Sequence, residues 1–200
     1  MCPDIGLGKM TGEEVKFASR AGAKLEAAMD AFGLDVRGLT CADFGCNVGG
    51  FTDCLLRRGA ARVYAIDTGR GELAWKLRRD ARVVVMERTN ALHVDLPEPA
   101  DLVTIDVAWT PQQRVIPAAL RLLRPGGNVV SLLKPHYELA KLAGRKPFEG
   151  LSDREADDVC RTVCGRLAES GWGVRAAMRS VMRGKGGALE YLLWLSRAPG

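Results

Sequence analysis

Short apolar segments rich in β-branched residues alternate along this chain with segments of helical periodicity. Strands are predicted at residues 40–44, 63–66, 83–86, 102–106 and 128–133. Helices are predicted from residue 20 up to Gly33, and near residues 51–58, 72–79 and 112–123. Strands that alternate with helices in this way are typical of a parallel sheet covered by helices on both faces.

The last third of the chain departs from this alternation. Residues 136–150 are rich in proline, glycine and charge and are expected to form a loop, and a longer helix is predicted from Asp153, as its N-cap, to residue 170. Two further strands, at 174–179 and 189–195, follow as close neighbours. The prediction is therefore one α/β domain over residues 19–197, Rossmann-like, whose mostly parallel sheet has one antiparallel strand near its C-terminal edge. Residues 1–18 show no periodicity and are expected to form a flexible lead-in.

Composition excludes several classes of protein. Six cysteines in 200 residues, with no Cys-x-x-Cys pair, indicate reduced thiols in a cytoplasmic protein and no structural metal site. No apolar run reaches the roughly 18 residues that cross a bilayer, and no secretion leader opens the chain, so we expect no membrane partner.

The net charge of +5 is unevenly distributed. From Arg57 to Arg88 there are nine arginines and lysines against four acidic residues, whereas the rest of the chain carries 20 of each. A second segment, from Arg175 to Lys185, has four cations and no acid. Clustering of this kind indicates binding to a polyanion such as RNA, although charged runs are more often simply solvated surface.

A glycine-rich loop follows the first predicted strand and runs into a helix. Gly-x-x-x-Gly-Gly differs from the dinucleotide-binding pattern, and no phosphate-binding Gly-Lys-Ser/Thr segment occurs. Asp67 ends the second strand, where a carboxylate can accept hydrogen bonds from both hydroxyls of a ribose. We therefore expect S-adenosylmethionine rather than NAD. The residues expected to hold it are Asp43, Gly45, Cys46, Asn47, Gly49, Gly50, Phe51, Asp67 and Asp106.

Ionisable residues end two other strands. Asp106 follows an apolar run, and Lys134 follows another just before a proline. A lysine in such a place can remove a proton from a hydroxyl, but a structural ion pair is an equally good interpretation of these two residues alone. Lys24, in a glycine-flanked segment, and Glu190, in an otherwise apolar strand, extend the set. Spacing alone does not decide whether Glu190 faces a cation or solvent.

Several of these segments resemble the hemolysin-A-type (TlyA-like) ribosomal RNA 2′-O-methyltransferases of the FtsJ-like superfamily. The resemblance extends from about residue 19 to residue 195. The most specific segments are Ser19-Arg-Ala-Gly-Ala-Lys24, Asp43-Phe-Gly-Cys-Asn-Val-Gly-Gly-Phe-Thr52, Gly71-Glu-Leu-Ala-Trp-Lys-Leu-Arg78, Glu87-Arg-Thr-Asn-Ala91, Lys134-Pro135 and Leu189-Glu-Tyr191.

This resemblance implies a class I methyltransferase fold that uses S-adenosylmethionine, with Asn90 near the adenine. It also implies a Lys-Asp-Lys-Glu catalytic tetrad at Lys24, Asp106, Lys134 and Glu190. Lys134 would deprotonate a ribose 2′-hydroxyl, Asp106 and Lys24 would orient that hydroxyl, and Glu190 would hold the lysines; no metal is required. Family members usually carry an N-terminal S4-type RNA-binding domain, and only about 18 residues precede the match here. RNA affinity is therefore expected from the two basic segments or from a partner.

Three other functions compete with this prediction. The first is a non-catalytic protein of the same fold that binds RNA or a ribosome precursor. The second is a dehydrogenase, which the glycine spacing disfavours. The third is membrane damage, for which the sequence shows no sufficiently amphipathic basic helix.

Overall fold

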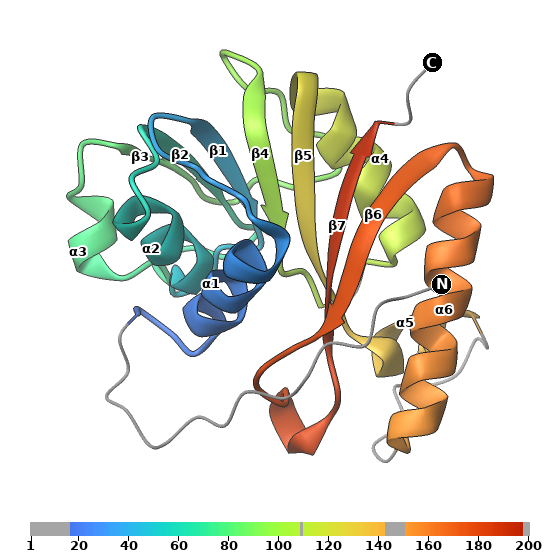
Figure 1. Ribbon diagram of the computed structural model, residues 1–200. Coiled ribbons are helices and arrows are strands. Elements are labelled where there is room, and N and C mark those ends of the chain that lie inside the picture. Colours follow the sequence, from blue (N-terminus) through green and yellow to red (C-terminus); the bar gives the residue numbers. More distant parts are fainter. Residues whose placement is uncertain (1–16, 109, 143–150, 198–200) are drawn as a thin grey trace.

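The computed structural model describes residues 17–108, 110–142 and 151–197, with the side chains of 141 and 142 left aside, and these residues form one sheet between two helical layers (Figure 1). Within the described residues the sheet has seven strands, in the order β3-β2-β1-β4-β5-β7-β6. The strands are β1 (Thr40–Phe44), β2 (Arg62–Ile66), β3 (Val83–Met86), β4 (Ala100–Ile105), β5 (Leu123–Leu133), β6 (Trp172–Arg179) and β7 (Tyr191–Arg197). The seven strands that the periodicity predicts are all present.

The strand directions confirm the predicted mixed sheet. Strands β1 to β5 pair in parallel, and β7 pairs antiparallel with both β5 and β6. The antiparallel strand is β7, which lies near the C-terminal edge as predicted, between β5 and β6. The β6–β7 connection lets the chain return between β5 and β6, an insertion that no local pattern predicts.

Helices cover both faces of the sheet (Figure 1). They are α1 (Ala21–Phe32), α2 (Gly50–Arg57), α3 (Trp75–Arg78), α4 (Gln112–Leu122), α5 (Pro135–Leu142) and α6 (Asp153–Glu169), with a short 3₁₀ turn at Lys185–Gly187. Alternate residues of each central strand enter opposite cores. In β1, for example, Cys41 belongs to the core that α1 and α2 help to form, whereas Ala42 and Phe44 belong to the core that α4 and α6 help to form.

Two helical boundaries correct the predictions. Ser152, not Asp153, is the N-cap of α6, because its hydroxyl accepts the backbone N–H of Glu155 while the Glu155 carboxylate accepts that of Ser152. Helix α5 occupies the first part of the expected loop at 136–150; the remaining residues of that loop, 143–150, lie outside the described residues. Pro135 is the first residue of α5, where the missing N–H costs nothing.

The ordered domain begins earlier than expected. Phe17 is buried, and the backbone N–H of Ala18 donates to the Asp53 carboxylate at 2.8 Å. The predicted flexible lead-in of residues 1–18 is thus wrong for its last two positions, since tertiary contacts order them. Residues 1–16 lie outside the described residues.

Helices α1 and α2 approach so closely that glycine is needed at the crossing. A Cβ atom on Gly22 would lie 2.5 Å from the Phe17 Cβ and 2.8 Å from the Gly50 carbonyl oxygen. We expect Gly22→Ala to lower the free energy of unfolding by about 1–3 kcal/mol, because both helices must shift. Gly165→Ala in α6 is the matched control, since its Cβ would meet nothing within 4 Å. It should raise stability by about 1 kcal/mol. Urea unfolding of both variants tests this, and equal effects would contradict it.

In the part of the chain that the structure describes, no helix combines the length and apolar character required to traverse a bilayer.

Candidate active site

The glycine-rich loop joins the end of β1 to α2. Gly45, Asn47 and Gly49 all have positive φ, at 79°, 44° and 100°. A Cβ on Gly45 would lie 2.6 Å from the Asp106 carbonyl oxygen, and one on Gly49 would lie 2.3 Å from the Leu77 side chain. The loop therefore needs glycine both for its backbone conformation and for its close packing on β4 and α3.

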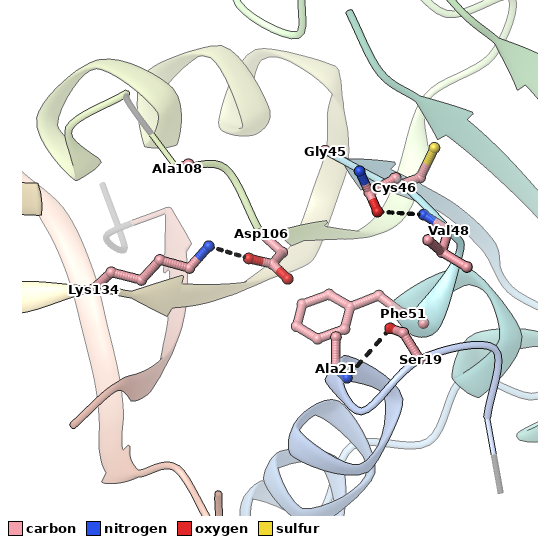
Figure 2. Close-up of a pocket in the computed structure, with 11 residues that line it drawn as sticks. Ser19, Ala21, Gly45, Cys46, Val48, Phe51, Asp106, Ala108 and Lys134 are labelled. Atoms are coloured by element: carbon pink, nitrogen blue, oxygen red, sulfur yellow. Dashed lines mark hydrogen bonds and ion pairs between the residues drawn. The ribbon is translucent and has the colours of Figure 1, made fainter. Parts of the chain in front are cut away.

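A pocket of about 260 Å³ opens between this loop, α1 and the carboxyl ends of β4 and β5 (Figure 2). Its lining residues are Ser19, Ala21, Gly45, Cys46, Asn47, Val48, Gly50, Phe51, Asp106, Ala108 and Lys134. Open α/β sheets bind their ligands at this edge, next to the point where the strand order reverses. In this sheet the order reverses between β1 and β4.

Lys134 and Asp106 meet inside the pocket. Figure 2 shows their side chains pointing toward one another, with the Lys134 Nζ atom 2.5 Å from an Asp106 carboxylate oxygen. Asp106 comes directly after β4, and Lys134 lies between β5 and α5. Because β4 and β5 are parallel neighbours, their ends place these two side chains together.

A second ion pair joins Lys24 of α1 to Glu190, directly before β7. Both side chains are buried, at 10% and 5% exposure. The sequence left open whether Glu190 faces a cation or solvent, and the structure decides for the cation.

His136, in the first turn of α5, lies close to both pairs. Burial lowers the pKa of His136, and the charges of Glu190 and Lys134 act on it in opposite directions. Its Nδ1 atom is buried and has no hydrogen-bond partner among the described residues. The four residues predicted as a tetrad therefore form two ion pairs, one in the pocket wall and one between α1 and the start of β7, with His136 close to both.

Asp67 ends β2 beside the glycine loop. One of its carboxylate oxygens accepts the backbone N–H of Asn47 at 2.9 Å, and the other accepts that of Gly69 at 2.7 Å. These bonds hold the half-buried carboxylate in place, and each oxygen keeps a lone pair for a ligand hydroxyl.

Asp43 does not face the pocket, in contrast to its predicted role in holding the cofactor. Its carboxylate is fully buried beneath the loop, where it accepts the hydroxyls of Thr52 at 2.7 Å and Thr104 at 3.1 Å. The reason is strand geometry: Asp43 points to the face of β1 that α2 covers, so it fastens the loop and its helix to the sheet.

Five other predicted residues also lie outside the pocket lining, namely Asp67, Lys24, Glu190, Gly49 and Asn90. Gly49 supports the loop from behind, against Leu73 and Leu77. Asn90 is exposed, and its side chain accepts the backbone N–H of Leu92 in a local turn. Its predicted position near the adenine remains a prediction.

Four further residues line the pocket without being predicted from the sequence, namely Ser19, Ala21, Val48 and Ala108. Ser19 and Ala21 enter because the start of α1 packs against Gly50, whose Cβ would lie 2.2 Å from the Ser19 hydroxyl. The small residues at the start of α1 indicate that another segment packs closely against it, but the pattern does not predict that this segment is the start of α2.

The pocket fits the adenosyl cofactor expected from the sequence. At Gly45 the floor of the pocket is bare backbone, because glycine has no Cβ atom. At the end of the neighbouring strand, the Asp67 carboxylate is held in place and keeps lone pairs free for a ligand. Asp106 and Lys134 add polar groups on the opposite wall. In the described residues no cluster of side chains could hold a metal ion.

The fold and this site together define a Rossmann-like S-adenosylmethionine-dependent methyltransferase. A family model described as FtsJ-like methyltransferase matches residues 17–197, and the chain belongs to that family. Membership confirms S-adenosylmethionine as the methyl donor.

Several known proteins are similar over most of the chain. The 16S/23S rRNA (cytidine-2′-O)-methyltransferase TlyA of Mycobacterium tuberculosis is 39% identical over 193 residues, which cover 93% of this chain and 70% of TlyA. Hemolysin A of Brachyspira hyodysenteriae is 33% identical, over 90% of this chain and 77% of its own. The solved structure of a hemolysin-type protein from Streptococcus thermophilus superposes with a TM-score of 0.86 at 32% identity, over 96% of this chain and 71% of the other.

Loss of the Asp67 carboxylate is expected to weaken cofactor binding. Asp67→Ala should raise the dissociation constant for S-adenosylmethionine roughly 10- to 100-fold, because hydrogen bonds from ligand hydroxyls to a charged acceptor are worth about 1.5–3 kcal/mol. Titration calorimetry measures this, with Asp95→Ala as the control, because Asp95 is an exposed aspartate that pairs with Arg121 and does not line the pocket. Unchanged affinity in Asp67→Ala would exclude the predicted ribose contact.

The buried Asp43 makes stability depend on pH. Burial raises the pKa of Asp43 to about 7, above the value of about 3.9 in an unfolded chain. A raised folded-state pKa means that this group's stabilising contribution is complete below pH 3.9 and is lost as the pH rises toward 7. We expect Asp43→Asn to remove this part of the pH dependence of the melting temperature between pH 4 and 7. A profile parallel to that of the wild type would contradict the assignment.

Proposed function

We propose that this chain transfers the methyl group of S-adenosylmethionine to a ribose 2′-hydroxyl of RNA, and that ribosomal RNA is the substrate class. The observation that carries the proposal is the Lys134–Asp106 pair in the wall of the cofactor pocket. The curated relatives support the substrate class, because TlyA proteins of two organisms are named as rRNA (cytidine-2′-O)-methyltransferases.

The four ionisable residues suit the chemistry of a hydroxyl nucleophile. When bound, S-adenosylmethionine supplies an electrophilic methyl group on a sulfonium sulfur, which leaves with the electron pair of the broken carbon–sulfur bond. Lys134, in its neutral form, accepts the 2′-hydroxyl proton on Nζ as the oxygen attacks, and Asp106 stabilises the resulting ammonium.

Lys24 and Glu190 act from the α1 side. Lys24 orients the hydroxyl, and Glu190 offsets its charge so that a buried ammonium is tolerated beside the site. Retention of both pairs favours catalysis over a binding-only protein of this fold, since a protein that only binds needs neither.

Transfer of labelled methyl groups to RNA tests the proposal. Total RNA and ribosomal subunits are prepared from a strain that lacks this gene and incubated with the wild-type protein. Label that survives alkaline hydrolysis in a dinucleotide, because the adjacent phosphodiester is protected by the 2′-O-methyl group, is the expected result. Label on a base, or no label although calorimetry shows cofactor binding, would overturn the proposal.

A further inference from the structure

Trp75 is the most exposed large apolar side chain among the described residues, at 71%. It opens α3, which packs on the glycine loop through the next buried leucine, Leu77. The backbone N–H just before it, of Ala74, donates to the Val48 carbonyl at 3.0 Å. Val48 is itself 36% exposed and lines the cofactor pocket. Trp75 therefore stands on the rim next to the pocket.

The basic segment around Trp75 is less available than its composition indicates. Of the nine cations from Arg57 to Arg88, six form ion pairs within the described residues. These are Arg57 and Lys76 with Asp53, Arg58 with Asp30, Arg62 with Glu98, Arg78 with Glu87, and Arg82 with Asp80. Most of the segment's charge is thus already compensated inside the protein.

Three cations of the segment remain, Arg70, Arg79 and Arg88, and one of them lies beside Trp75. The Arg79 guanidinium lies 6.0 Å from the centroid of the Trp75 ring, and no ion pair to Arg79 or Arg70 occurs in the residues that the structure describes. Arg70 acts electrostatically on Glu87, the carboxylate that α3 contacts through Arg78. An exposed indole beside uncompensated guanidinium groups is the combination that binds single-stranded nucleic acid, because every base has a face for stacking and every phosphate a charge.

We infer that Trp75 is a stacking platform for an unpaired base of the RNA substrate, and that Arg79 and Arg70 contact the adjoining phosphates. This inference rests on the proposed function and extends it, since it says where RNA outside the reacting nucleotide is held. RNA fits this surface better than a protein partner, because the apolar area is a single ring and the guanidinium of Arg79, which has no ion-pair partner among the described residues, lies over it.

Binding of a fluorescent single-stranded oligocytidylate tests the inference. Trp75→Ala should weaken its binding roughly 5- to 100-fold, and Trp75→Phe should retain most of the affinity, because stacking on an aromatic ring is worth that factor per base. Arg79→Ala should also weaken binding, whereas Arg161→Ala, an exposed arginine of α6, should not.

Three results of the affinity measurements would each overturn the inference. They are wild-type affinity of Trp75→Ala for the oligonucleotide, an equal loss for a fully paired RNA duplex, and a loss of affinity for S-adenosylmethionine measured by calorimetry. If Trp75→Ala still bound the oligonucleotide but no longer sedimented with ribosomal subunits, the inference would also be overturned, in favour of a contact between Trp75 and a ribosomal protein.

Methyl transfer separates the two proposals. If the wild-type protein binds RNA through Trp75 but does not methylate it, only the proposed function is contradicted. Methylation with an unchanged KM in Trp75→Ala contradicts only this inference.

Discussion

Lys134→Ala is expected to slow methyl transfer by about two to four orders of magnitude while cofactor affinity stays within a few-fold of the wild type. General-base catalysis contributes a factor of this size, and the alanine side chain cannot accept the 2′-hydroxyl proton. The pocket loses one wall group, but the glycine loop and Asp67 remain as they are. Single-turnover methylation and titration calorimetry on the same preparation measure the two effects separately.

Lys134→Arg is the matched control for charge. Arginine keeps a positive group beside Asp106, yet it stays protonated and cannot act as a base. We expect it to be nearly as inactive as the alanine variant but to have wild-type stability. An active arginine variant would show that Lys134 acts through its charge alone, and proton abstraction would then belong to another group.

Removal of the Glu190 carboxylate alone is expected to cost about 3–5 kcal/mol of folding stability. Glu190→Leu leaves the Lys24 ammonium buried without its counterion, which is the expensive way to break a buried pair. Urea unfolding measures the loss.

The double variant Lys24→Met with Glu190→Leu tests the same account from the other side. It removes both charges and should recover most of the lost stability, because a buried pair can often be replaced by apolar side chains at little cost. Methyl transfer should remain low in the double variant if Lys24 orients the hydroxyl. If the stability loss of the double variant equalled the sum of the losses of Lys24→Met and Glu190→Leu, the two residues would not be coupled.

Much of this architecture follows from local pattern. The glycine loop, the strands and the stop of α1 at Gly33 are readable because each depends on residues close together in the chain. Two site residues are also predictable from pattern. Asp106 and Lys134 each follow an apolar strand, and the carboxyl ends of parallel strands lie at a common edge of the sheet.

The sequence pattern gives the wrong prediction where contacts between distant parts of the chain override local preferences. Helix α5 was expected as part of a loop, yet the Glu138 carboxylate accepts the backbone N–H of Gln112 at 2.8 Å and binds α5 to the start of α4. Asp43 was expected in the pocket because it precedes the glycines. Its two threonine partners, Thr52 and Thr104, lie on different elements and draw it beneath the loop.

Local pattern is enough to predict the order of the elements, the place of the nucleotide loop and the kinds of groups at the strand ends, because hydrophobic periodicity and turn chemistry depend on residues close together in the chain. Tertiary structure alone decided which of those groups meet. Sheet order joins Asp106 to Lys134, and the crossing of α1 over the start of β7 joins Lys24 to Glu190. The same holds for part of the surface charge, since the acidic partners of Arg58, Arg62 and Lys76 lie 28, 36 and 23 residues away in the sequence. Ion pairing depends on distance in space, and distance in space is set by the packing of the whole sheet and its helices.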